Sequence, residues 1–179
     1  MGLIDFVRAA GEKIFGTSEA AASPTTDETV LSKRATALEE HVGQLGLPVE
    51  GLKIKVAGDV AYVKGTAATQ EAREKVLLAV GNVAGIARVE NRLDVTNPQP
   101  EARYYTVVKG DTLSKIAKQE YGDANKYPQI FEANKPMLTH PDKIYPGQVL
   151  RIPRAVGEAS PQTNIEPRRA RQPDAPGVR

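Results

Sequence analysis

The stretch Tyr104-Tyr105-Thr106-Val107-Val108-Lys109-Gly110-Asp111-Thr112-Leu113 decides the architecture of the C-terminal half of the chain. Its β-branched and aromatic start is typical of a strand, and Gly110-Asp111 is typical of a turn. Asp111 or Thr112 can cap a helix that begins at Leu113, because a short side-chain oxygen accepts a hydrogen bond from the first backbone N–H groups of a helix. A strand, a turn and a helix are therefore expected in succession.

The residues that follow add a second helix and a second strand. The first helix is expected to end at Tyr121-Gly122, and the next spans residues 126–134. A turn at residues 144–148 then leads into a strand at residues 149–153. Residues 104–153 are therefore predicted to form a small βααβ domain.

Upstream, the pattern predicts a second small domain, of αββαβ order, over residues 28–96. Its expected helices and strands lie at residues 28–44, 52–56, 60–65, 72–80 and 86–95. The strand at 52–56 alternates apolar residues with two lysines, which is the period of a half-buried strand. Thr69 is a suitable N-cap for the second helix. Prolines at 98 and 100 resist both helix and ladder pairing, so residues 97–103 are interpreted as a linker.

The two ends of the chain complete the predicted fold. Apolar residues from Leu3 to Ile14 have helical spacing, so residues 1–16 are predicted to form an amphipathic helix that packs on the next domain. Residues 17–27 form a linker. Residues 154–179 contain four prolines and almost no apolar side chains, which predicts a disordered tail. The expected fold class is α+β, with two small domains and a disordered C-terminal tail.

Composition argues against several classes of function. The 24 basic and 22 acidic residues leave a formal net charge of +2, too small to drive nucleic-acid binding by phosphate neutralisation. No stretch approaches the roughly 20 apolar residues of a membrane span. Cysteine is absent, so disulfides and thiolate nucleophiles are excluded. Asp5 and Arg8 interrupt the only stretch that could act as a secretory signal, so a cytoplasmic location is expected.

Catalytic groups are also missing from the sequence. The two histidines, His41 and His140, have no metal-ligand spacing and are expected at the surface. Glu39-Glu40 and the pair Glu71 and Glu74 lie on predicted helices, where exposed charge is the usual role. We therefore expect a binding protein and not an enzyme.

The segment Gly81-Asn82-Val83-Ala84-Gly85-Ile86 follows the second helix of the upstream domain. Carbonyl groups at a helix C-terminus lack intrahelical partners, and a bend bracketed by glycines can turn several of them toward one point. Neutral carbonyl oxygens suit potassium, because they replace its hydration shell. No acidic calcium-type loop occurs in the chain. A simple helix stop is the alternative interpretation of this segment.

Short motifs in both predicted domains resemble known families. The Gly58 turn, Val63-Lys64-Gly65 and the passage from Gly81 to Val89 are similar to a BON domain. Residues 108–113 and 144–153 are similar to the opening and the end of a LysM domain. In LysM proteins a shallow groove binds glycans that contain N-acetylglucosamine, so this resemblance implies an alternative, glycan-binding site. The residues implied are Gly110, Asp111, Thr112, Asn134, Ile144 and Tyr145.

The start of the chain, the loop at residues 80–87 and the stretches 131–138 and 141–148 extend the likeness to the whole arrangement. It resembles the bacterial cytoplasmic potassium-binding proteins of BON–LysM type. This resemblance implies reversible binding of potassium, and also of rubidium and caesium, in preference to sodium, with a change from an open to a compact shape. The ligands would be main-chain carbonyl oxygens, shared between the N-terminal segment and the BON bend. The candidates are Val7, Ala10, Glu12, Gly81, Val83 and Ile86.

Three functions remain open at this point. The first is a monomeric potassium sensor or buffer in the cytoplasm, acting in osmotic stress. The second is a LysM protein that binds peptidoglycan at the cell envelope. The third is an adaptor whose LysM domain binds an unidentified protein.

Overall fold

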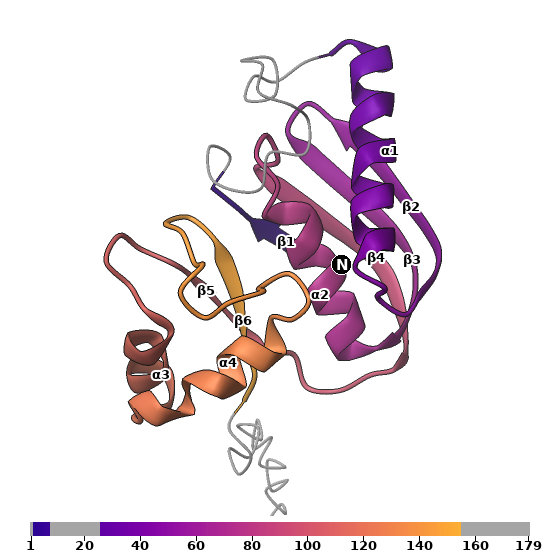
Figure 1. Ribbon diagram of the computed structural model, residues 1–179. Helices are drawn as coiled ribbons and strands as arrows, with labels where there is room; N and C mark the ends of the chain where they lie inside the picture. Colours follow the sequence, from indigo (N-terminus) through magenta and orange to yellow (C-terminus); the bar gives the residue numbers. More distant parts are fainter. Residues whose placement is uncertain (1, 8–25, 155–179) are drawn as a thin grey trace, which may run out of the picture.

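The computed structural model describes residues 2–7 and 26–154 of the chain (Figure 1). These residues form two small α+β units, which confirms the predicted fold class. The first unit is a four-stranded sheet with two helices, and the second is a two-stranded sheet with two helices and a 3-10 turn. Residues 17–25 of the linker expected at 17–27 lie outside the described residues, as do residues 155–179 of the tail expected at 154–179.

The larger sheet has the strand order β1-β4-β3-β2. Strands β2 (Val49–Ala57) and β3 (Val60–Thr69) form an antiparallel hairpin around a two-residue turn. Gly58 starts this turn at φ 62°, a backbone conformation that favours glycine. Strand β4 (Arg88–Asn97) pairs parallel to β3, and helix α2 makes the connection between them. The predicted strand at 86–95 began two residues early, because Ile86 and Ala87 belong to the bend that precedes β4.

The helix predicted for residues 1–16 is wrong where the structure can test it. Gly2–Asp5 form strand β1, which pairs antiparallel with β4, Ile4 lying opposite Val89. Burial follows the period of a strand here: Leu3 is exposed, Ile4 is half-buried, Asp5 is exposed and Phe6 is buried. The open edge of β4 satisfies the backbone of this segment, and a helix would leave that edge unpaired. Residues 8–16 lie outside the described part of the chain.

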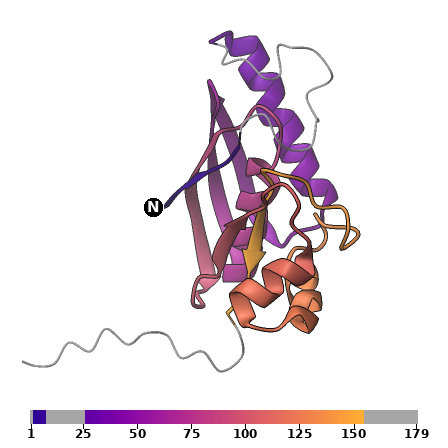
Figure 2. The ribbon, with the colours of Figure 1, turned by 90° about the vertical axis from the view of Figure 1, so that its left-hand side faces the viewer.

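Both helices of the first unit cover the same face of the sheet (Figure 2). Helix α1 spans Glu28–Gln44, as predicted, and Asp27 caps it by accepting from the N–H groups of Thr29 and Val30. Helix α2 spans Gln70–Gly81, and its predicted N-cap, Thr69, accepts from the N–H of Ala72 at 3.1 Å. The core lies between these helices and the sheet. Its most deeply buried side chains include Leu38, Val63, Val76, Leu77, Leu78, Ile86 and Val89.

The second unit has the predicted βααβ order. Strand β5 (Arg103–Thr106) pairs antiparallel with β6 (Val149–Ile152). Helix α3 (Leu113–Tyr121) is capped by Thr112, and a 3-10 turn, η2 (Ala124–Lys126), leads into α4 (Tyr127–Ala133). Its core is formed by Val107, Leu113, Ile116, Ala117, Ile130, Leu138, Leu150 and Ile152. None of the helices in the described ranges has the length and apolar character needed to cross a membrane.

A buried ion pair joins the two units. Glu74 of α2 is only 1% exposed, and its Oε2 accepts from Nε of Arg151 in β6 at 2.6 Å. Its Oε1 accepts from the N–H of Ala102 and from the amide of Gln70. The expectation that Glu74 is an exposed charge is therefore wrong, because the second unit covers this face of α2.

Candidate functional site

The bend that follows α2 is fixed by backbone hydrogen bonds from several directions. The N–H of Asn82 donates to the carbonyl of Leu78, and that of Ile86 donates to the carbonyl of Val83 at 3.2 Å. The turn between β2 and β3 holds the far end of the bend, since the carbonyl of Asp59 accepts from the N–H of Ala87 at 2.8 Å. Gly85 lies at φ 101°, where a side chain would be strained. The bend is therefore a rigid backbone feature.

The N-terminal strand lies directly against this bend. The N–H of Phe6 donates to the carbonyl of Ala87 at 2.8 Å. The ring of Phe6 lies over Gly81 so closely that a methyl group built on Gly81 would overlap it. Val7 follows at once and is 44% exposed. The structure thus brings the predicted N-terminal ligand Val7 to the segment that holds Gly81, Val83 and Ile86.

The surroundings of the bend are apolar, and the groups offered to a ligand are backbone oxygens. The side chains of Val83 and Ile86 are fully buried, and Phe6 is 9% exposed. Within the described residues, the Val83 carbonyl accepts from the N–H of Ile86, and a carbonyl oxygen has a second lone pair. Within the described residues, no group of three or more His, Cys, Asp or Glu side chains could hold a metal ion. The predicted ligands Ala10 and Glu12 lie outside the described residues.

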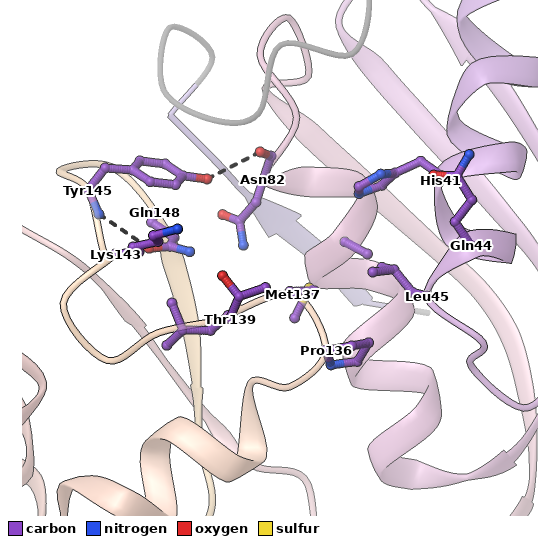
Figure 3. A pocket seen from close by; sticks show the side chains of 12 residues that line it. His41, Gln44, Leu45, Asn82, Pro136, Met137, Thr139, Lys143, Tyr145 and Gln148 are labelled. Carbon is purple, nitrogen blue, oxygen red and sulfur yellow. Dashed lines mark hydrogen bonds between the residues drawn. The ribbon is translucent and has the colours of Figure 1, made fainter.

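Asn82 connects the bend to the second unit, a role that the sequence did not indicate. Its side-chain amide bonds to the backbone of Val149 as a neighbouring strand would. Nδ2 donates to the carbonyl of Val149 and Oδ1 accepts from the N–H of Val149, both at 2.8 Å. Its main-chain carbonyl accepts from the hydroxyl of Tyr145 at 3.3 Å (Figure 3). An asparagine three residues before a glycine, as Asn82 is before Gly85, normally indicates only a helix end. Its partners lie more than 60 residues away in the chain.

The six residues of the alternative glycan site are largely occupied by contacts within the protein. The side chain of Asn134 is 1% exposed and bonds to the backbone of Ile130 and Arg151. Asp111 accepts from the hydroxyl of Tyr105 and the N–H of Val108, and Thr112 accepts from the N–H of Lys115. Tyr145 is directed toward Asn82 (Figure 3). The glycan alternative is therefore not favoured. Of the other two residues, Gly110 is exposed and Ile144 is half-buried.

The histidines and glutamates considered as catalytic groups lie at separate places in the fold. His140 is exposed, whereas His41 is half-buried at the end of α1, so only one of the two is the surface residue that was predicted. Glu39 is half-buried and its Oε1 accepts from the N–H of Ile54 at 2.8 Å. Glu71 pairs with Lys75 at 2.8 Å, and the hydrogen bond from Lys75 lowers the pKa of the Glu71 carboxyl.

Residues 27–97 match the BON domain family, and residues 105–153 match the LysM domain family. The potassium binding protein Kbp of Escherichia coli is 47% identical over 154 residues, which are 86% of this chain and 99% of Kbp. The chain belongs to the Kbp family. The match includes almost all of Kbp.

Other relatives match shorter segments than Kbp does. An uncharacterized protein of Deinococcus radiodurans is 53% identical over 49 residues, 27% of this chain and 19% of that protein. An esterase of Mycobacterium tuberculosis is 49% identical over 53 residues, 30% of this chain and 11% of the esterase. The second match is too small a part of the esterase to suggest esterase activity here, and the Kbp family likeness points to a binding protein.

Proposed function

We propose that this protein binds potassium at the bend after α2, through main-chain carbonyl oxygens of that bend and of the N-terminal segment. The proposal rests on the likeness to the potassium binding protein Kbp and on one structural observation: the N-terminal strand docks on the bend through Phe6. Gly81, Val83 and Ile86 would supply oxygens from the bend. Val7, Ala10 and Glu12 would supply them from the N-terminal segment, Glu12 also through its main chain.

The chemistry of the bend suits a large monovalent cation. Potassium binds neutral carbonyl oxygens that replace its hydration shell, and its weak hydration lowers the cost of entering an apolar site. Val83 and Ile86 supply such surroundings, because both side chains are fully buried. Rubidium and caesium should bind as well, and sodium should bind more weakly.

Ion binding would be coupled to the shape of the protein through the N-terminal segment. An ion that is shared between two segments favours the state in which both are docked, and it shifts the population by its difference in affinity for the two states. We propose that potassium compacts the protein in this way. A monomeric ion sensor or buffer of the cytoplasm, active in osmotic stress, is the role that fits such a response, and cell fractionation would test the compartment.

A titration with potassium chloride and, separately, sodium chloride tests the proposal. We expect potassium to shift the amide NMR signals of residues 81–86 in a saturable manner, and sodium to leave them largely unchanged. Removing residues 2–12 should abolish potassium binding in calorimetry while the amide signals of the second unit stay dispersed. Unchanged affinity after this deletion, or equal shifts with sodium, would refute the shared carbonyl site.

A further inference from the structure

The structure contains a cleft between the two units that the proposed ion site does not use (Figure 3). It is lined by the C-terminal end of α1, the C-terminal end of α2 and the loop between α4 and β6. Its volume is about 520 Å³. Small-molecule sites occur preferentially at domain junctions and have volumes of roughly 300–1,000 Å³. Position and size therefore both fit a small ligand.

The side chains around the cleft divide into an apolar part and a polar part, in which Lys143 carries the positive charge. Leu45, Ala79 and Met137 are half-buried or buried and supply apolar surface. Lys143 and His41 line the cleft from the loop and from α1, on opposite sides in Figure 3. The lining contains no Asp or Glu. Any ligand would thus meet positive charge that no lining carboxylate neutralises.

Lys143 is the group available to a ligand. Its side chain is exposed, and its ammonium makes no ion pair with any residue of the described ranges. Asn82 and Tyr145 also face the cleft, but they already bond to Val149 and to each other.

We propose that the cleft binds a small organic anion. Its apolar body would lie on Leu45 and Met137, and its anionic group would pair with Lys143. A cation is disfavoured by Lys143, and a neutral molecule would lack the charge–charge attraction that an anion gains from it. The cleft adjoins the carbonyl bend at Asn82, but neither Lys143 nor Met137 is a proposed potassium ligand, so the inference stands whether or not the bend binds potassium.

Benzoate and benzamide form a matched pair of probes, because they share one apolar ring and differ in charge. Met137 is a convenient reporter, since the chain has only two methionines and the other is Met1. We would label the methionine methyl groups with ¹³C and titrate the full-length protein in sodium buffer. We expect benzoate to shift the Met137 methyl signal saturably, in the millimolar range, and benzamide to bind several-fold more weakly.

Substitution of Lys143 tests how much its charge contributes to binding, independently of the shape of the cleft. We expect Lys143→Ala to weaken benzoate binding about fivefold, the upper range for an exposed ion pair, and to leave benzamide unchanged. Lys118→Ala is the matched control, because Lys118 is also exposed but lies on α3 and does not line the cleft. Equal binding of both probes, the same affinity in all three proteins, or a Met137 signal that neither probe moves would overturn the proposal.

Discussion

The contact between Phe6 and Gly81 determines how the N-terminal strand meets the first unit. Gly81 is the last residue of α2, and its α-carbon lies beneath the Phe6 ring with no room for a methyl group. Burying a phenylalanine side chain stabilises a protein by about 1.5–3 kcal/mol. One absent methyl group therefore permits a contact that secures the start of the chain.

Gly81→Ala should destabilise the protein, contrary to the usual effect of this change in a helix. Replacing glycine by alanine in a helix normally gains about 0.5–1 kcal/mol. Here the new methyl group would displace Phe6, so we expect the free energy of unfolding in urea to fall by about 2 kcal/mol. Hydrogen exchange of the β1 amides should accelerate at the same time.

Gly43→Ala is the matched control for this experiment. Gly43 also lies in a helix, α1, and a methyl group built there meets no atom within 4 Å. We expect this variant to be as stable as the wild type or more stable. A Gly81→Ala protein that gained stability as well would show that Phe6 does not dock on Gly81.

Among the elements, the end of α2 contacts three other parts of the molecule. It leads into the bend, receives the N-terminal strand and holds β6 through Asn82. Val149, the partner of Asn82, is 2% exposed, so its backbone N–H and carbonyl have little access to water. Leaving a buried polar group without a partner costs about 1–3 kcal/mol. The Asn82 amide therefore contributes to the packing of the two units.

Removing this amide tests its contribution. We expect Asn82→Ala to lower the free energy of unfolding by about 2–4 kcal/mol, since two backbone groups lose their partner. Asn82→Asp should cost at least as much as Asn82→Ala, because a carboxylate oxygen would replace the donor and face the Val149 carbonyl. Asn97→Ala should change stability by less than about 1 kcal/mol, since Asn97 is exposed and makes one side-chain bond, to Ala68. Equal losses for Asn82→Ala and Asn97→Ala would contradict this account.

Local signals in the sequence predicted most elements but not β1. Helix α1 and the Thr69 cap depend on neighbouring residues, so periodicity and capping were sufficient to predict them. Strand β1 has four residues, too few to distinguish a period of two from a helical pattern. Its structure is decided by pairing with the edge of β4, whose residues lie 83 to 89 positions later in the sequence.

The candidate site shows the same division between local and distant causes. The glycines at 81 and 85 indicated a bend, and the structure has one. The burial of Glu74 could not be predicted, because a glutamate within a helix is usually solvated. Its partner Arg151 is 77 residues away. Contacts between the two units leave no local pattern in a sequence.

At the scale of the whole molecule, the Glu74–Arg151 pair links the two units through their interior. Arg151 is 11% and Glu74 is 1% exposed at the side chain, so water screens their interaction weakly. Burial raises the pKa of the nearby Tyr104 hydroxyl, and the Glu74 carboxylate raises it further. The interface between the units is therefore a dry, charged contact that requires both partners.

Breaking this pair on one side should uncouple the two units. We expect Glu74→Gln to lower the free energy of unfolding by about 3–5 kcal/mol, because Arg151 would stay buried without its counter-charge. In calorimetry we expect one thermal transition for the wild type and two for this variant. Lys75→Gln, one position along the same helix, removes the pair with Glu71, whose side chain is 50% exposed, and should cost less than about 1 kcal/mol. A single, unshifted transition for Glu74→Gln would show that the units fold independently of this contact.

The position of β1 has a consequence for the behaviour of the protein in solution. With β1 in place, β4 is an inner strand of the sheet, between β1 and β3. Without β1, the N–H and carbonyl groups along one side of β4 become an open template for another chain. A protein that lacks its first seven residues should therefore self-associate as its concentration rises. The segment that completes the sheet would thus also prevent aggregation through the edge of β4.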